Sequence, residues 1–249
     1  MKVSIITVCW NSEKYITTAI QSVLSQTYHN IEYIIVDGGS TDKTIDIIKE
    51  FEPMFNGRMR WISEKDKGIY DAMNKGILMT TGDVVGLLNS DDFYVSDIAI
   101  NNVVDCFVKN NTDSLFADLY YVKEDDTDKI KRRWKTGAKE MFSTGWHPAH
   151  PAFFVKKQIY DKYGTFDLKY SIAADFELML RFLEKYNVSS FYLEEFILKM
   201  RLGGESNRSF SNIRKGNKEI IDGFKKHQIK IPFYYTYKRW MAKLFQHFG

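Results

Sequence analysis

The stretch GDVVGLLNSDDFY, residues 82–94, joins an apolar run to a pair of acidic residues. The apolar run at 84–88 predicts a buried strand, and Asp91 and Asp92 follow it closely. Open α/β sheets bind ligands beyond the carboxyl ends of their strands, so we expect both carboxylates at such an edge. Two adjacent carboxylates favour a hard divalent cation, Mg²⁺ or Mn²⁺, that bridges to a phosphate. The alternative is an acidic cap on the helix that follows.

The first hundred residues alternate between the patterns of strands and helices. Apolar, β-branched runs predict strands at residues 3–8, 31–36, 59–63 and 84–88. Apolar residues at helical spacing predict helices near 16–24, 45–51, 69–79 and 100–107. This alternation predicts right-handed crossovers and a mainly parallel sheet that is covered on both faces. We therefore expect the chemistry in the loops after the strands, at residues 7–12, 37–42 and 89–92.

Beyond residue 110 the pattern changes to strands with short helices between them. Strands are predicted at 114–122, 129–134, 152–155, 190–193 and 197–202, and the clearest helix at 175–185. This arrangement favours a second, partly antiparallel layer over further parallel units.

The chain from Pro232 onward combines an apolar stripe with basic residues. The apolar and aromatic members are Tyr237, Trp240, Met241, Leu244, Phe245 and Phe248, and the basic ones are Lys238, Arg239 and Lys243. A basic, aromatic, amphipathic helix can lie on an anionic bilayer surface. The same stripe could equally dock on the body of the domain.

Composition limits the class of protein. A chain of 249 residues that is 44% hydrophobic can bury a real core, which excludes disorder and fibres. A net charge of +3 is too balanced to indicate a nucleic-acid partner. Cys9 and Cys106 lie in apolar stretches and predict buried, reduced thiols. The N-terminus lacks a signal-peptide pattern and no segment reaches the roughly 20 apolar residues of a spanning helix, so we expect a cytoplasmic protein.

Four motifs, in this order and spacing, resemble glycosyltransferase family 2, the inverting enzymes with the GT-A fold. They are VSIITVCWN (3–11), IEYIIVDGGSTDKT (31–44), SEKDKGIYDAMNKGI (63–77) and GDVVGLLNSDDFY. The resemblance covers about residues 1–205 and implies a nucleotide-sugar donor, with UDP favoured, a divalent metal and a hydroxyl acceptor. It implies a nucleotide-sugar-binding half at 1–110, an acceptor-binding and catalytic half of the same domain at 111–205, and a helical extension at 206–249.

The resemblance extends to the acceptor side and to a class of product. KYSIAADFELMLRF (169–182) and MRLGGESN (200–207) resemble enzymes that build bacterial surface polysaccharides, which implies a glycan or lipid-linked glycan acceptor. In that pattern Asp175 is the catalytic base. Chemistry supports the role, since a carboxylate must take the proton of the attacking hydroxyl. Glu177 is the reserve candidate, and a simple helix cap is the alternative for Asp175.

Further residues take roles on the donor side. By resemblance, Asp92 is the direct metal ligand, and Asp91 binds the ribose or supports the metal. Other expected contacts with the nucleotide sugar are Thr7, Asn11, Asp37 (to the pyrimidine), Asp66 (to the nucleoside), Lys67 (to the diphosphate) and Asn74. Ordinary turn and cap functions are the alternatives for the DGGSTD segment, and a solvated surface position for Lys67.

Two more elements could face the diphosphate. In GWHPAHPAFF (145–154), His150 fits a position that binds the metal or the diphosphate better than His147 does, although turn histidines without such a role are equally compatible. Arg201, with the glycine-containing segment at 203–206, predicts a mobile loop that closes over the diphosphate.

Other classes of protein fit less well. A sugar-phosphate nucleotidyltransferase would show a glycine-rich, basic signature after the first strand, and a dinucleotide-dependent dehydrogenase would show G-x-G-x-x-G there; residues 7–15 contain no glycine. A non-catalytic nucleotide-sugar-binding protein at the membrane remains an alternative, because a fold does not guarantee an activity. The presence of Asp91, Asp92 and Asp175 together argues against it.

Overall fold

The computed structural model describes residues 1–202 and 210–235. Its first half follows the predicted alternation closely: β1 (Val3–Cys9), α1 (Ile16–Leu24), β2 (Ile31–Asp37), α2 (Thr44–Phe51), β3 (Met59–Ser63), α3 (Ile69–Met79), β4 (Val84–Leu87) and α4 (Ala99–Asn110). The prediction missed a two-residue strand, β5 (Phe93–Tyr94), and a short helical turn, η1 (Glu52–Phe55). Both are too short to produce a hydrophobic period.

The second half contains β6 (Ser114–Val122), β7 (Ile130–Trp134), η2 (Phe142–Thr144), η3 (His150–Ala152), β8 (Phe153–Lys156), α5 (Lys157–Tyr163), α6 (Ala174–Leu180), η4 (Arg181–Lys185), β9 (Ser190–Arg201) and α7 (Phe210–Lys226). The prediction of two strands at 190–193 and 197–202 is wrong, because β9 is continuous. Its register against β6 shifts around Asp118, which interrupts the alternation that the sequence shows. The predicted helix at 175–185 is present as α6 and the wider turn of η4.

Among the described residues, nine strands form one sheet in the order β3-β2-β1-β4-β8-β6-β9-β5, with β7 paired to β6. The pairs β1–β2, β2–β3, β1–β4 and β6–β9 are parallel. Strand β8 is antiparallel to both β4 and β6, so these two run in the same direction. The predicted α/β fold is therefore confirmed, and β1, β2, β3, β4, β6 and β9 direct their carboxyl ends to one edge.

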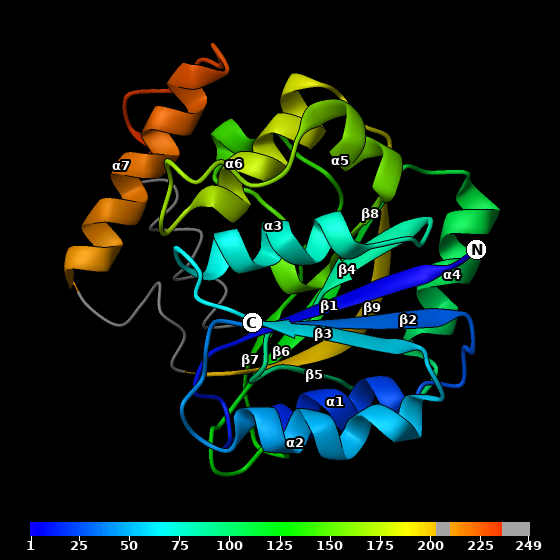
Figure 1. Cartoon of the computed structure of the whole chain (residues 1–249). Helices are drawn as coiled ribbons and strands as arrows, with labels where there is room; N and C mark the ends of the chain where they lie inside the picture. The colour runs from blue at the N-terminus through cyan, green and yellow to red at the C-terminus, as the bar shows by residue number, and fades with distance from the viewer. Residues whose placement is uncertain (203–209, 236–249) are drawn as a thin grey trace.

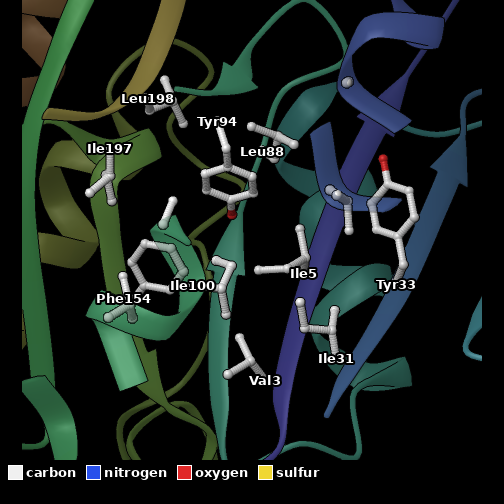
Figure 2. Packing of buried hydrophobic residues seen from close by; sticks show 14 of the residues in the cluster. Val3, Ile5, Ile31, Tyr33, Leu88, Tyr94, Ile100, Phe154, Ile197 and Leu198 are labelled. Atoms are coloured by element: carbon white, nitrogen blue, oxygen red, sulfur yellow. The ribbon is translucent and has the colours of Figure 1, made fainter. Parts of the chain in front are cut away.

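Helices cover both faces of the sheet (Figure 1). Side chains of the central strands alternate between two cores. From β1, Val3 and Ile5 join the core under α1, α2 and α4, while Ile6 and Val8 join the core under α3, α5 and α6. Figure 2 shows part of the first core, where Ile5 and Tyr33 lie among side chains from neighbouring strands. Since both faces of the sheet are covered, β1, β2 and β4 are buried along their whole length and are mostly apolar.

Two glycines permit close packing beneath the functional edge. A Cβ at Gly76 of α3 would lie 2.4 Å from Ile6 Cγ2, and a Cβ at Gly86 of β4 would lie 2.4 Å from Phe154 Cε1. The absence of a side chain therefore lets α3 approach β1 and lets the Phe154 ring cover β4. These contacts fix the strand that leads to Asp91 and Asp92.

Helix α7 lies outside α6, far from the α1 and α2 layer (Figure 1). Its Ile220 and Phe224 are buried in the core that α6 lines. The prediction of buried, free thiols is confirmed for Cys9 and Cys106. No helix within residues 1–202 and 210–235 is long and apolar enough to cross a membrane. The expected loop at 203–206 and the amphipathic stripe from Tyr237 to Phe248 lie outside the described residues.

Candidate functional site

The loops after β1 and β2 are joined by hydrogen bonds at the carboxyl edge of the sheet. Asn11 has a left-handed backbone, φ 47°, which asparagine tolerates better than most residues. Its N–H donates to Ser40 Oγ at 2.7 Å, and its Oδ1 accepts from the Thr41 N–H at 2.9 Å. Asn11 thus holds the DGGSTD turn against the first loop.

Asp37 organises this turn from the end of β2. Its Oδ2 accepts the backbone N–H groups of Gly39 and Ser40, each at 2.9 Å, and the Ser63 hydroxyl at 2.7 Å. Burial by itself would raise the pKa of Asp37, but the hydrogen bonds from Ser40, Ser63 and the turn amides lower it. The carboxylate is therefore charged and already paired, and its expected contact with a pyrimidine stays a prediction.

Thr7 does not line the cleft with its side chain. The residue is fully buried in β1, and its hydroxyl is 2.9 Å from the Tyr33 hydroxyl. The sequence could not reveal this orientation, because both faces of the strand are apolar. The hydroxyl of Thr7 is therefore used within the fold, and the expected contact of Thr7 with the donor stays a prediction.

The loop after β3 places Asp66 against the DGGSTD turn. A Cβ at Gly38 would lie only 2.5 Å from Asp66 Oδ2, so the carboxylate occupies the space that a larger residue 38 would fill. Asp66 Oδ1 also accepts the Gly68 N–H at 2.8 Å. Lys67, next in the loop, is exposed. The structure therefore brings Asp66 and Lys67 to the same edge as Asn11 and Asp37.

The Asp91–Asp92 pair lies at the end of β4, as the sequence predicts. Asp92 closes a turn, with its N–H donating to the Asn89 carbonyl at 3.1 Å and its Oδ2 accepting from Asn89 Nδ2 at 2.9 Å. Arg201, at the end of β9, donates to the Asp91 carbonyl, and its guanidinium lies 5.0 Å from the Tyr15 ring and 4.9 Å from the Phe93 ring. These contacts hold the backbone of the acidic pair beside the buried guanidinium group of Arg201.

The surroundings of Asp92 would compensate a negative charge on its carboxylate only in part. The residue has no exposed surface, and its Oδ1 has no hydrogen-bond partner within the described residues. Burial, followed by the charge of Asp91, raises the pKa of Asp92 well above its usual value; burial also raises that of Asp91. An unpartnered carboxylate oxygen beside a second carboxylate fits a divalent cation, which would stabilise the charged forms.

Asp175 lies in the first turn of α6 and faces α3. Its Oδ1 accepts from the Tyr70 hydroxyl at 3.1 Å, and the same hydroxyl lies 2.9 Å from the Ile172 carbonyl oxygen. His150 is close enough for the charge of Asp175 to act on it, although burial is the larger effect and lowers the pKa of His150. His150 Nε2 is buried with no hydrogen-bond partner in the described part of the chain.

His150 is thus associated with the candidate base. Within residues 1–202 and 210–235, no three His, Cys, Asp or Glu side chains gather into a group that could hold a metal ion. Its contact with a metal or diphosphate stays a prediction.

Helix α7 holds the backbone that precedes Asp175. Glu219 Oε2 accepts the N–H groups of Ile172 and Ala173, each at 2.9 Å, and its Oε1 accepts that of Ser171 at 3.1 Å. These amides lead into α6, which has no side-chain cap of its own. Glu219 and Tyr70 therefore fix the base from two sides.

Asn74 and Glu177 have structural functions that the sequence did not predict. Asn74 exchanges two hydrogen bonds of 2.9 Å with the backbone of Phe166, so its amide anchors a loop instead of facing the donor as expected. Glu177 is 1% exposed and lies 2.9 Å from Lys226 Nζ, 2.6 Å from His227 Nε2 and 3.2 Å from an Arg181 nitrogen. This buried charge cluster docks α7 and excludes Glu177 as a reserve base.

Tyr121 connects the two acidic groups, and the sequence analysis missed it. Burial, together with the negative charges of Asp92 and Asp175, raises the pKa of Tyr121 to about 12, although Arg132 opposes the shift. Both carboxylates therefore lie close enough to Tyr121 for their charges to act on its hydroxyl. Tyr70 lies in a quoted motif and could have been noticed, whereas no local pattern identifies Tyr121 or Glu219.

Comparison with known sequences assigns the chain to a family. The profile of "Glycosyl transferase family 2" matches residues 4–168. An uncharacterized glycosyltransferase of Mycobacterium tuberculosis is 30% identical over 180 residues, which are 72% of this chain and 68% of that protein. A PGL/p-HBAD biosynthesis glycosyltransferase of Mycobacterium bovis is 31% identical over 185 residues, with the same coverage of 72% and 68%.

Solved structures share the fold. S. aureus TarS 1-349 in complex with UDP-GlcNAc superposes with a TM-score of 0.67 at 17% identity, over 90% of this chain and 66% of that one. The mannosyltransferase PcManGT from Pyrobaculum calidifontis, in complex with GDP-Man and Mn²⁺, gives a TM-score of 0.68 at 16% identity, over 93% and 66%. This chain spans only 40% of the longer TarS chain that it also matches.

We predict that Glu177→Gln destabilises the fold by about 3–5 kcal/mol, as expected when one partner of a buried charge cluster is removed. The cluster lowers the pKa of Glu177 from 4.5 to about 2. A lowered pKa stabilises the folded state above the unfolded value, and this stabilisation disappears as pH falls toward the folded value. Urea denaturation at several pH values should therefore show that Glu177→Gln has a lower free energy of unfolding than the wild type. This difference should be complete at pH 7 and should shrink below pH 4.5.

Glu195→Gln is the matched control, because Glu195 is exposed. Equal stability of the two variants at pH 7 would contradict a structural function for Glu177.

Proposed function

This chain belongs to glycosyl transferase family 2, and we propose that it transfers a sugar from a nucleoside-diphosphate donor to an acceptor hydroxyl with inversion at the anomeric carbon. The observation that carries the proposal is the buried Asp92 carboxylate, whose Oδ1 has no hydrogen-bond partner among the residues that the structure describes, together with Asp175 in the first turn of α6. One carboxylate is next to a site for a cation, and the other is at a helix start where a base can meet an acceptor.

On the donor side, Asp91 and Asp92 would hold Mn²⁺ or Mg²⁺, with Asp92 as the direct ligand through its unpartnered oxygen. The ion, when bound, supplies Lewis-acid stabilisation of the diphosphate leaving group. Arg201 adds positive charge beside the pair and keeps the turn in place. Asn11, Asp37, Asp66 and Lys67 would form the nucleotide end of the cleft, and Lys67 would reach the diphosphate from its exposed position.

On the acceptor side, Asp175 would take the proton of the attacking hydroxyl. The acceptor oxygen forms a bond to the anomeric carbon while the bond from that carbon to the diphosphate oxygen breaks. A single displacement without a protein nucleophile inverts the anomeric configuration. Tyr70 and Glu219 orient Asp175, and correct orientation of a reacting group lowers the barrier substantially.

We further propose a UDP-sugar donor and a glycan or lipid-linked glycan acceptor used in surface polysaccharide assembly. The resemblance around Asp37 and Asp66 supports uridine, as does the UDP-GlcNAc complex of TarS; the GDP-Man complex of the mannosyltransferase supports guanosine as the second candidate. The resemblance of residues 169–182 and 200–207 to enzymes of surface polysaccharide assembly supports the acceptor class, and the relative named for PGL/p-HBAD biosynthesis supports a biosynthetic glycosyltransferase. A nucleotidyltransferase is disfavoured because the loop after β1 contains no glycine within residues 10–15.

We predict that UDP binds only together with a divalent ion and only when the acidic pair is intact. In a thermal-shift assay, UDP with Mn²⁺ should raise the melting temperature of the wild type, because a ligand that binds the folded state stabilises it. Asp91→Asn/Asp92→Asn should abolish that shift without loss of stability, since it removes a poorly compensated buried charge.

The exposed acidic pair of the loop before β7, changed as Asp125→Asn/Asp126→Asn, is the matched control and should retain the shift. A full shift in the Asp91/Asp92 variant, or an undiminished shift in EDTA, would refute the metal assignment.

For Asp175→Asn we expect nucleotide and metal binding to remain while turnover falls by about 10²- to 10⁴-fold, the range of a general base. Release of UDP from a UDP-sugar in the presence of acceptor measures turnover, and the thermal shift measures binding. Asp161→Asn, at an exposed aspartate of α5, should be neutral in both. If Asp175→Asn instead loses the thermal shift with UDP and Mn²⁺, the residue belongs to the donor side.

We also propose peripheral contact with an anionic membrane through the tail beyond Tyr235. Its basic residues would each contribute about 1 kcal/mol near such a surface, an attraction that salt screens. The full chain should co-sediment with vesicles containing phosphatidylserine, and less so as salt rises. A chain ending at Tyr235 should not. Equal sedimentation of both chains would leave the tail without this function.

A further inference from the structure

A pocket of about 210 Å³ opens between the end of β7 and the segment that contains η2. Its lining includes Trp134, Thr136, Glu140, Thr144, Trp146 and His147. None of these side chains belongs to the donor site described above. The pocket is nevertheless next to that site, because aromatic contacts lead from it in two directions.

One direction leads to the candidate base. The His147 ring packs edge-on against Phe176, with ring centroids 5.6 Å apart, and Phe176 follows Asp175 in α6. The other direction leads to Tyr121, whose ring stacks on Trp134 with centroids 6.2 Å apart. The negative charges of Asp92 and Asp175 contribute to the raised pKa of the Tyr121 hydroxyl. Two aromatic side chains of the lining, His147 and Trp134, therefore contact the residue after Asp175 and Tyr121, respectively. A molecule whose reacting hydroxyl is at Asp175 could extend into the pocket.

The aromatic walls of the pocket are fixed before any ligand binds. Trp146 donates its indole N–H to the Thr136 carbonyl at 2.8 Å and packs against Phe116 and Phe142. The Thr136 N–H is held in turn by Asp118 Oδ1 at 2.8 Å. Trp134 is held between Tyr121 and the edge of the His147 ring, 5.3 Å away. Ordered indole rings offer apolar area at little conformational cost on binding.

The rest of the lining is polar and acidic. Glu140 accepts a hydrogen bond from the Thr144 hydroxyl at 3.0 Å, and both residues line the pocket. A pyranose ring matches this combination, since its C–H faces suit an indole and its hydroxyl rim suits a carboxylate and hydroxyls. An aliphatic chain would cover these polar groups without offering them a hydrogen-bond partner, which is costly. Phosphate is disfavoured by Glu140, and the lining within the described structure includes no lysine or arginine.

We propose that this pocket is an acceptor subsite that binds one pyranose ring of a glycan, adjacent to the sugar whose hydroxyl Asp175 deprotonates. The inference deepens the proposed transferase function and rests on it. The volume supports a single ring, because pockets for drug-sized ligands hold about 300–1,000 Å³.

Saturation-transfer NMR on the full chain, without donor, tests the subsite. The probes are methyl α- and β-pyranosides of glucose, galactose, mannose, rhamnose and N-acetylglucosamine, with cyclohexanol and inorganic phosphate for comparison. At least one glycoside should bind. Trp134→Ala should weaken that binding by at least about tenfold, and Trp134→Phe should restore part of it. Trp61→Ala, at a partly buried tryptophan of β3 on the opposite edge of the sheet, should leave it unchanged.

Glu140→Gln provides a second variant at an exposed residue, where folding is not at risk, and should weaken glycoside binding several-fold. The inference is overturned if no glycoside binds the wild type, if phosphate or cyclohexanol binds better, or if Trp134→Ala and Trp61→Ala bind equally well. The thermal shift with UDP and Mn²⁺ should be the same in all these variants. Failure of the proposed transferase function would appear differently, as the absence of that shift in the wild type.

Discussion

The buried carboxylate of Asp92, which has an unpartnered oxygen and a second carboxylate beside it, is the constraint on which the site depends. A sheet that served only stability would not keep such a charge, because burying an uncompensated anion is costly. The surroundings compensate it in part: Asn89 donates to one oxygen, and Arg201 stands beside the turn from the end of β9. The uncompensated part produces a negative potential at the edge where the parallel strands end. A cation bound there could also bind a diphosphate.

The other half of the site depends on the docking of α7. Glu177 and Glu219 attach this helix to α6, and only Glu219 holds the backbone immediately before Asp175. Asp175 and Glu177 are two residues apart in the chain, yet one meets a tyrosine hydroxyl at the cleft and the other is buried among three basic side chains. The helix turn separates them, so proximity in sequence says little about which carboxylate can act as a base.

The sequence predicted the parallel half of the sheet nearly residue by residue, because buried strands and amphipathic helices leave strong periodic patterns there. It also placed Asp91 and Asp92 after the end of a strand and Asp175 at the start of a helix, where the structure has them. It gave no sign that the side chains of Thr7 and Asn74 bond within the fold, since the type of a polar residue does not say which way its side chain points. Tyr121 and Glu219 were missed because their roles arise from long-range packing between β6, α6 and α7. The sequence predicted two strands in place of the continuous β9, because a register shift against β6 interrupts the alternation of apolar and polar residues along it.

Anomalous diffraction at the manganese edge, from crystals grown with UDP and Mn²⁺, tests the central claim most directly. The account predicts one manganese peak within coordination distance of Asp92, about 2.1–2.3 Å for a hard cation and oxygen ligands, bridged to the diphosphate and next to Asp91. It also predicts that the open side of the diphosphate faces Asp175 across Tyr121. A nucleotide bound without an ion at Asp92, or an ion held at a different group of side chains, would contradict the account.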